Sequence, residues 1–267
     1  MLKGAVLGSP IAHSLSPVLH NTAFSLLSID GSYEAIDVPS GTLAEFFTAS
    51  QENFDYLSLT MPLKEEALSL ALNFDPLSIR IGSANTLYRI GDQWHGTSTD
   101  GSGLLSALKV AGHSSFSNVL ILGAGGTARA AAGALDHISK KISVMGRTSS
   151  RRDALQKCVT SSNFEYLPWN NQADLAEYDL VVNTTPAGAA DLLAENLPNA
   201  VSAPLFDVIY KPWPTVLASR WSDRGGGVLS GKELLLWQGL DQLALVLGKT
   251  LDVSVIAPPL RERLLQS

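Results

Sequence analysis

The sequence feature that most constrains the fold is a glycine-rich turn between an apolar segment and an alanine-rich one. Leu120-Ile121-Leu122 leads directly into Gly123-Ala124-Gly125-Gly126-Thr127-Ala128. The first glycine permits a tight turn, the second lets the backbone approach a diphosphate, and the small Ala128 lets helix and strand pack closely. Backbone N–H groups at the helix start would face the phosphates. A glycine turn without a ligand is the alternative, but this strand–turn–helix context predicts a dinucleotide site at residues 123–128.

The segment after the next predicted strand indicates which dinucleotide is bound. An NAD-binding chain places Asp or Glu roughly twenty residues beyond the glycine turn, to bind the ribose 2′-hydroxyl. Here the segment is Gly146-Arg147-Thr148-Ser149-Ser150-Arg151-Arg152, with no acid before Asp153. Arg147 and Arg151 can form bidentate hydrogen bonds to a 2′-phosphate, and Thr148 offers a hydroxyl. The alternative, a solvated basic helix start, opposes the helix dipole. The sequence therefore predicts NADP as the cofactor.

Short apolar segments alternate with helical patterns along the chain, which predicts an α/β fold with parallel strands. In a first series we expect strands at 5–7, 33–38 and 56–60, helices at 16–27, 42–49 and 64–72, and a hairpin at 85–96. In a second series we expect strands at 119–122, 142–145, 180–183 and 205–209 and helices at 126–135 and 233–247. The prolines at 258 and 259 then precede a last short helix. The second series has the order of a nucleotide-binding domain.

Length and charge limit the function classes. The 267 residues fit one large or two modest domains of roughly 100–200 residues. Nineteen basic and 25 acidic residues give a net charge of −6 without any Lys/Arg-rich run, so we expect neither nucleic acid nor a membrane as partner. No segment reaches the ~20 apolar residues of a membrane span, and we expect a cytoplasmic protein. A single cysteine, Cys158, excludes an intrachain disulfide, and we expect no metal.

A second motif lies near the N-terminus and is dense in hydroxyl and imidazole groups. It is Gly8-Ser9-Pro10-Ile11-Ala12-His13-Ser14-Leu15-Ser16-Pro17-Val18-Leu19-His20-Asn21. Ser14 and Ser16 can donate hydrogen bonds to an anionic substrate, although the two serines could equally cap a helix. The motif matches G-x-P-x-x-H-S-x-S-P-x-x-H-N, the opening pattern of the shikimate dehydrogenase family, at every fixed position. The chain is therefore identified as resembling this family.

Further motifs match the family in the same order along nearly the whole chain. They are Thr60-Met61-Pro62-Leu63-Lys64, Gly82-Ser83-Ala84-Asn85-Thr86, Thr99-Asp100-Gly101, the glycine turn, Arg147-Thr148, Asn183-Thr184-Thr185-Pro186-Ala187-Gly188, Asp207-Val208-Ile209-Tyr210-Lys211-Pro212 and Gly231…Gln238. The resemblance implies an α/β fold of two domains separated by a cleft. Residues 1–101 with 233–267 would form the substrate-binding, catalytic domain, to which the C-terminal helix returns, and residues 102–232 a Rossmann-like NADP-binding domain.

The resemblance also implies an activity, the NADPH-dependent reduction of 3-dehydroshikimate to shikimate in aromatic amino-acid biosynthesis. Reducing a ketone by hydride transfer leaves negative charge on oxygen, which requires a proton and a nearby cation. A lysine ammonium supplies both, and a carboxylate can orient it. Spacing alone favours a solvated Lys64 and a helix-capping Asp100. The family resemblance instead implies that these two residues form the catalytic pair, side by side.

Other roles are likewise implied by the resemblance. Ser14 and Ser16 would hold the substrate carboxylate. Thr60, Asn85 and Gln238 would contact its hydroxyls, and Tyr210 would lie near the ring or carboxylate. Thr185 and Gly231 would join residues 123–128, Arg147, Thr148 and Arg151 around NADP. We expect only small-molecule partners for this protein, as a monomer or homodimer.

Some positions depart from the family pattern. Ser58 and Ser98 stand where asparagine is common, Gly146 replaces the usual asparagine before Arg147, and Leu234 and Leu243 stand where methionine and an aromatic residue are frequent. Two other functions remain open. A quinate/shikimate dehydrogenase often has threonine for one serine of the carboxylate pair and an acid near position 147, and neither feature is present. A catalytically silent NADP-binding protein has no chemical need for both Lys64 and Asp100.

Overall fold

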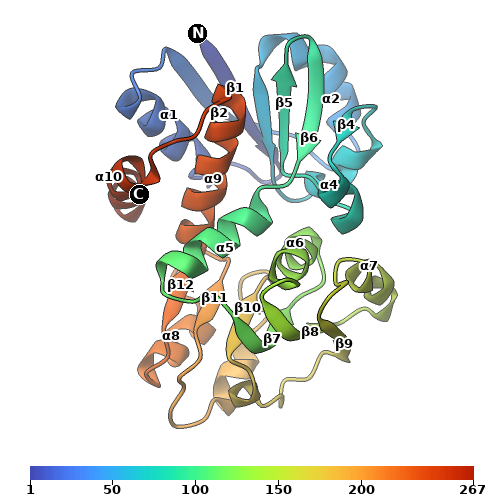
Figure 1. Cartoon of the computed structure of the whole chain (residues 1–267), viewed down its shortest axis with the longest axis vertical. Coiled ribbons are helices and arrows are strands. Elements are labelled where there is room, and N and C mark those ends of the chain that lie inside the picture. Colours follow the sequence, from blue (N-terminus) through green and yellow to red (C-terminus); the bar gives the residue numbers. More distant parts are fainter. The chain divides into compact units, whose positions relative to one another are not determined.

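The structure, a computed structural model, describes all residues from 1 to 267 and divides into two compact units (Figure 1). The first unit combines Met1–Gly103 with Leu235–Ser267, and the second is the continuous segment Leu104–Leu234. Two helices, α5 (Asp100–Val110) and α9 (Gly231–Leu247), carry the chain from one unit to the other. No helix combines the length and apolar character needed to cross a membrane.

The first unit contains a mixed six-stranded sheet in the order β2-β1-β3-β5-β6-β4. Its strands are β1 (Leu2–Gly8), β2 (Gly31–Asp37), β3 (Tyr56–Leu59), β4 (Asn73–Phe74), β5 (Thr86–Ile90) and β6 (Gln93–Thr97). Strand β1 runs parallel to β2 and β3, whereas β5 runs antiparallel to β3 and β6. The end of β3, the start of β5 and the end of β6 therefore meet at one edge of the sheet.

Helices of the first unit are α1 (Ser16–Leu26), α2 (Leu43–Ser50), α3 (Leu63–Glu66), α4 (Pro76–Ile81) and α10 (Val253–Leu265), together with the ends of α5 and α9 that belong to it. Central strand β1 is buried from Gly4 to Gly8 because elements cover both faces of the sheet. One core cluster includes Leu7, Leu57 and Leu87 from three adjacent strands. Helix α10 packs beside α1 although the two are far apart in sequence (Figure 1).

The second unit is a six-stranded, entirely parallel sheet in the order β12-β11-β10-β7-β8-β9. Its strands are β7 (Phe116–Leu122), β8 (Ser139–Gly146), β9 (Asn163–Pro168), β10 (Leu180–Asn183), β11 (Leu205–Asp207) and β12 (Val228–Ser230). Its helices are α6 (Gly126–Leu135), α7 (Arg152–Gln156) and α8 (Val216–Asp223). The strand order reverses between β7 and β10, and ligands bind at the carboxyl ends of strands at such a switch point.

The α/β class and the Rossmann-like parallel sheet that we predicted are confirmed. Two local predictions were wrong. The helix expected at 64–72 is shorter, because α3 ends at Glu66 and gives way to a 3₁₀ turn at Ala67–Ser69. The last helix begins before the two prolines, at Val253, and contains Pro258 and Pro259. Ile256, Leu260 and Leu264 are buried along it, and this packing outweighs the N–H groups that the prolines lack.

The core of the first unit contains a fully buried histidine, His20 on α1. Its ring stacks on Tyr33 with centroids 4.0 Å apart, and its Nδ1 lies 2.8 Å from the Tyr56 hydroxyl. Burial lowers the pKa of His20 from 6.5 to about 3, because the imidazolium is far less solvated inside the protein than in water. His20 is therefore neutral near pH 7.

This histidine predicts a loss of stability in acid. Between pH 6.5 and about 3 the unfolded chain binds a proton at His20 that the folded chain excludes, so this contribution is complete above pH 6.5 and is lost as the pH falls. Two pH units below 6.5, the stability lost amounts to roughly 3 kcal/mol. Urea unfolding of His20→Phe should show a weaker pH dependence than wild type between pH 7 and 4.5, and the same dependence between pH 7 and 9. Identical acid dependence in the two proteins would contradict the assignment.

Candidate active site

The candidate active site of the first unit is built around an ion pair. Lys64 lies on α3, directly after β3, and Asp100 is the first residue of α5, directly after β6. The Lys64 Nζ donates a hydrogen bond to Asp100 Oδ2 at 2.5 Å. The side chain of Lys64 is 18% exposed and that of Asp100 is 6% exposed, so solvent screens the pair little. Because the first sheet brings the ends of β3 and β6 to one edge, these two residues meet despite 36 positions of separation.

Asn85 holds the other oxygen of this carboxylate. It immediately precedes β5, and its Nδ2 donates to Asp100 Oδ1 at 2.8 Å and to Gln238 Oε1 at 3.2 Å. Its Oδ1 accepts from the backbone N–H of Thr99 at 2.8 Å. Four of the predicted site residues, Lys64, Asp100, Asn85 and Gln238, are thus joined by hydrogen bonds. Asn85 is only 2% exposed, and its contact with a substrate hydroxyl stays a prediction.

Gln238 reaches this cluster because α5 and α9 approach closely at a glycine that our sequence reasoning did not single out. A Cβ atom on Gly103 would lie 2.6 Å from the backbone nitrogen of Gln238, too close for any side chain. Gly103 follows the Thr99-Asp100-Gly101 motif by two residues, one turn or less into the helix that Asp100 begins. Its closeness to that motif was the available signal in the sequence, but only the packing of two helices that are distant in sequence explains the need for a glycine.

The remaining predicted substrate residues of this unit lie in the segments that follow β3 and β1. Thr60 follows β3 and donates its N–H to the Leu7 carbonyl at 2.9 Å, while its own carbonyl accepts from the Leu63 N–H at 2.8 Å. Ser14 and Ser16 lie at the start of α1, where Ser14 Oγ accepts from the Ser16 N–H at 3.3 Å. Ser14 is half-buried and Ser16 is buried. Their contact with a carboxylate stays a prediction.

In the second unit the glycine turn joins β7 to α6. Gly123 has φ +105°, a conformation that side chains disfavour, and its N–H donates to the Met145 carbonyl at 2.9 Å. Gly125 is the N-cap of α6 with φ −86°, and a Cβ atom added to it would meet nothing within 4 Å. Ala128 is fully buried against the sheet. The protein therefore has no packing reason for a glycine at 125, which fits a place kept open for a diphosphate.

The two glycines should respond differently to substitution. Gly125→Ala is expected to fold with at most about 1 kcal/mol lost, because φ −86° suits any residue and the space is open. Its methyl group should raise the Kd for NADPH roughly tenfold by keeping the phosphates from the backbone N–H groups. NADPH titration and thermal unfolding measure the two effects. The prediction fails if NADPH binds Gly125→Ala as tightly as wild type.

Gly123→Ala is the matched comparison for this experiment. A Cβ atom there would lie 2.5 Å from the Thr184 hydroxyl oxygen and would impose a strained φ. We therefore expect Gly123→Ala to lose stability as well as cofactor affinity. If only Gly123→Ala loses stability, Gly123 is required by the fold and Gly125 by the ligand.

The predicted 2′-phosphate residues lie at the same edge of the sheet. Leu122 pairs with Met145 in parallel register, so the glycine turn and Arg147 follow neighbouring strand ends. Arg147, Thr148 and Arg151 are all exposed, as ligand-binding side chains at a strand end should be. The glycine at 146, a departure from the family pattern, has a physical cause, since a Cβ atom there would lie 3.0 Å from Cζ of Tyr166. The Tyr166 hydroxyl donates to the Thr148 carbonyl at 2.7 Å.

Next to the glycine turn, two buried polar side chains shape the loop after β10. The Thr185 hydroxyl donates to Asn183 Oδ1 at 2.7 Å, and Asn183 Nδ2 donates to Asp207 Oδ1 at 3.1 Å. Asp207 also accepts from the Thr215 hydroxyl at 2.7 Å, and burial raises the pKa of its carboxyl. The Thr184 N–H and hydroxyl both bind the Leu122 carbonyl. The loop that carries Thr185 is thus fixed at the switch point between β7 and β10.

Two further predicted residues, Tyr210 and Gly231, also lie in the second unit. Tyr210 follows β11, and its substrate contact stays a prediction. Gly231 begins α9, where its N–H donates to the Ile209 carbonyl at 3.1 Å and a Cβ atom would lie 2.9 Å from that carbonyl carbon. Gly231 is therefore required by backbone packing, whatever it contributes to a cofactor.

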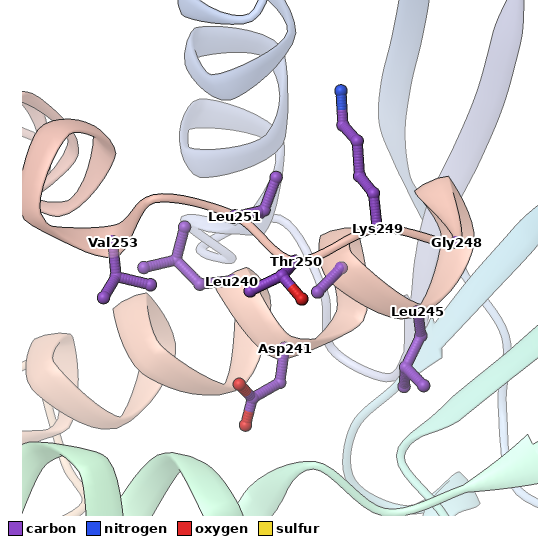
Figure 2. A pocket seen from close by; sticks show the side chains of 9 residues that line it. Leu240, Asp241, Leu245, Gly248, Lys249, Thr250, Leu251 and Val253 are labelled. Atoms are coloured by element: carbon purple, nitrogen blue, oxygen red, sulfur yellow. The ribbon is translucent and has the colours of Figure 1, made fainter.

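A separate pocket of about 450 Å³ lies at the carboxyl end of α9 and contains none of the predicted site residues. Figure 2 shows its lining of Leu240, Leu245, Leu251 and Val253, with the charged end of Lys249 pointing away from Asp241. Asp241 accepts a hydrogen bond from the Ser102 hydroxyl at 2.5 Å. The candidate chemistry thus lies elsewhere, at Lys64 and Asp100.

Comparison with known proteins agrees with this arrangement. Residues 6–87 match the profile of the shikimate dehydrogenase substrate binding domain, and residues 106–208 match that of shikimate/quinate 5-dehydrogenase. The first range lies within the first unit and the second within the second unit.

Whole-chain relatives support the same assignment. The NADP(+)-dependent shikimate dehydrogenase of Exiguobacterium sibiricum is 31% identical over 98% of this chain and 99% of its own. The crystal structure of Mycobacterium tuberculosis shikimate dehydrogenase covers 98% of this chain and 100% of its own, with 33% identity and a TM-score of 0.88. That of the Thermus thermophilus enzyme in complex with NADP(H) and shikimate has the same coverage, 34% identity and a TM-score of 0.84. With both profiles in order, an extended match in sequence and the same fold, the chain belongs to the shikimate dehydrogenase family.

Proposed function

We propose that this protein is an NADP-dependent shikimate dehydrogenase, which reversibly reduces 3-dehydroshikimate to shikimate in the biosynthesis of aromatic amino acids. The observation that carries the proposal is the ion pair of Lys64 and Asp100, with Asn85 on the second carboxylate oxygen. An ion pair that is mostly buried costs desolvation energy, so a stabilising role alone is a weak explanation for it. The proposal includes a cytoplasmic location and a monomer or homodimer.

NADPH, when bound, supplies the hydride. We assign its diphosphate to the backbone of residues 123–128 and its 2′-phosphate to Arg147, Thr148 and Arg151. The nicotinamide end is assigned to the loop of Thr185, and Gly231 is assigned to the cofactor site as well. The open position at Gly125 supports this assignment, because packing does not require a glycine there, and the exposure of Arg147 and Arg151 leaves both accessible to a phosphate. The absence of an acid before Asp153 favours NADP over NAD.

Lys64 supplies the proton for the reduction. Hydride addition to the ketone leaves negative charge on oxygen, which the ammonium stabilises and protonates from Nζ. Asp100 holds Nζ in place through Oδ2 and keeps a negative charge beside it. In the reverse direction the amine takes the proton from the alcohol as the hydride leaves. Water then restores the protonation state of the pair after each turnover.

Uncharged hydroxyl and amide side chains recognise the rest of the substrate. Ser14 and Ser16 donate to the carboxylate without fixed charge, and Thr60, Asn85 and Gln238 bind hydroxyls, with Tyr210 near the ring. A site that bonds each hydroxyl rejects analogues that leave its polar groups unpaired. The serine pair, without the threonine that quinate/shikimate dehydrogenases often carry, and the absence of an acid near position 147 favour shikimate over quinate.

A single assay tests the proposal. Purified protein with NADPH and 3-dehydroshikimate should show loss of the nicotinamide absorbance, and the reverse reaction should run with shikimate and NADP⁺. Rates with quinate and with NAD⁺ should be much lower. Preference for quinate and NAD⁺ would identify a quinate dehydrogenase. Tight NADPH binding with no turnover on either substrate would identify a silent cofactor-binding protein, and either result overturns the proposal.

A further inference from the structure

A buried run of side chains connects the candidate active site to the interior of the first unit. It consists of Tyr33, Ser58, Gln242, Thr86 and Asn85, and we call it the amide–hydroxyl chain. All five residues are at most 5% exposed. They come from β2, β3, α9 and β5, with Asn85 immediately before β5. None of its members except Asn85 belongs to the site described above.

Consecutive members of the amide–hydroxyl chain are within hydrogen-bond distance. The Tyr33 hydroxyl lies 2.5 Å from Ser58 Oγ, which lies 2.8 Å from Gln242 Oε1. Gln242 Nε2 lies 2.9 Å from Thr86 Oγ1, which lies 2.7 Å from Asn85 Oδ1. Ser58 and Thr86 are direct partners across β3 and β5, so Gln242 from α9 bridges two neighbouring strands.

The direction of every hydrogen bond in the chain follows from one backbone group. The N–H of Thr99 can only donate, so the atom of Asn85 that it meets at 2.8 Å is the carbonyl oxygen, Oδ1. Thr86 must then donate its hydroxyl proton to Oδ1, and it can only accept from Gln242. The facing atom of Gln242 is therefore Nε2, and Oε1 accepts from Ser58. Nε2 also reaches the Asn85 backbone carbonyl at 3.4 Å, which again requires a donor.

This fixed direction determines what Asn85 presents to the ion pair. With Oδ1 held by Thr99 and Thr86, Nδ2 must face Asp100, and it donates to Oδ1 of that carboxylate at 2.8 Å. A rotated Asn85 amide would place a carbonyl oxygen against the carboxylate. The hydroxyls of Ser58 and Thr86 both accept and donate, whereas the Tyr33 hydroxyl donates, and such chains strengthen as a unit when their groups are satisfied.

We propose that Gln242 is a positioning residue for the reaction, which acts through Thr86 to hold the amide of Asn85 toward Asp100. The proposal rests on the proposed function, since it concerns the same ion pair. Ser58, a departure from the family pattern, takes part because its short hydroxyl joins Gln242 to Tyr33. Substitution at Gln242 should therefore act on turnover and not on the cofactor, whose predicted ligands lie in the other unit.

Gln242→Met removes both polar atoms with little change in side-chain length. We expect kcat for shikimate oxidation to fall roughly tenfold, which corresponds to the loss of one buried hydrogen bond, with the KM for NADP⁺ unchanged. Thr86→Val, whose side chain has the same shape as threonine, should lower kcat by a similar factor. Thr86→Ser keeps the hydroxyl and should have a kcat close to that of wild type. The double variant Gln242→Met/Thr86→Val should be no worse than either single variant, because both break the same link.

Tyr56→Phe is the matched control. The Tyr56 hydroxyl is also buried, and it lies 2.8 Å from Nδ1 of His20, which contacts the amide–hydroxyl chain at Tyr33 and Gln242 but does not link its members to Asn85. Tyr56→Phe thus removes a buried hydrogen bond beside the chain and leaves every bond between its members in place. Its loss should lower stability and leave kcat unchanged. Equal losses of kcat in Tyr56→Phe and Gln242→Met would mean that general destabilisation explains both, and unchanged kcat in Gln242→Met would overturn the proposal directly.

A crystal structure of Gln242→Met separates this proposal from the proposed function. We expect Asn85 Nδ2 to leave its position 2.8 Å from Asp100 Oδ1, whether or not the protein reduces 3-dehydroshikimate. An Asn85 amide that keeps this bond in the variant would overturn the positioning role even in an active enzyme. Absence of turnover in the wild-type protein would instead overturn the proposed function.

Discussion

Lys64→Ala is expected to lower kcat by about 10³-fold while leaving NADPH binding almost unchanged. The ammonium supplies the proton and the positive charge at the developing alkoxide, and such groups contribute roughly 10²–10⁴-fold. The affinity for NADPH should stay the same, because the glycine turn and the arginines belong to the second unit and Lys64 belongs to the first. Steady-state kinetics with 3-dehydroshikimate and fluorescence titration with NADPH measure the two quantities separately.

The control for this variant must address folding. Lys64→Ala leaves the mostly buried Asp100 carboxylate without its cation, which costs up to a few kcal/mol. Lys64→Ala/Asp100→Ala removes both charges and should restore stability without restoring activity. Lys249→Ala, a change of an exposed lysine in the same unit, should leave both unaltered. Near-wild-type turnover of Lys64→Ala would show that the acid–base assignment is wrong.

The second large effect is expected on cofactor choice. Arg147→Ala/Arg151→Ala should raise the KM for NADPH on the order of 10²- to 10⁴-fold, because two charge-assisted contacts to a phosphate are lost at about 1.5–3 kcal/mol each. The KM for NADH should hardly change, since NADH has no 2′-phosphate. Initial rates with both cofactors give the ratio of kcat/KM, which should fall by the same factor.

Arg152→Ala provides the comparison for the arginine experiment. Arg152 is exposed like its neighbours and begins α7, but it is not among the predicted phosphate ligands. Its removal tests whether positive charge in general, rather than these two side chains, attracts NADPH. If the double variant lost NADPH and NADH activity equally, the arginines would not be the residues that distinguish the two cofactors.

The sequence predicted those parts of the structure that depend on local patterns. Residues 126–135 and 180–183 match α6 and β10, because glycine turns and apolar runs define their ends. The two-residue strand β4 was not predicted, since two residues carry no period. The change from α3 to a 3₁₀ turn after Glu66 was not predicted either, because helix ends are the part of an element that a local pattern defines least well. Pro258 and Pro259 misled the prediction because proline is a local signal and α10 is held by long-range burial.

For the site, the sequence indicated residue types but not their connections. Lys64 and Asp100 were predicted as a pair only through the family resemblance, because their own spacing favours unrelated surface roles. The hydrogen bond between them depends on the antiparallel pairing of β5 and β6, which brings the end of β6 back to the end of β3. A short stretch of sequence around either residue does not reveal this. Gln242 was not predicted at all. On a helix otherwise dominated by leucines, its importance emerges only once Ser58 and Thr86 are seen as partners across two strands.

The division of the chain has a consequence for biosynthesis on the ribosome. The second unit is one uninterrupted segment, so it can fold as soon as its last strand has emerged. The first unit combines residues from before and after that segment, and Gln238 and Gln242 are translated only after the whole second unit. Lys64 and Asp100 are therefore translated before the second unit, but they acquire Gln238 and the Gln242-held amide of Asn85 only after that unit has been translated.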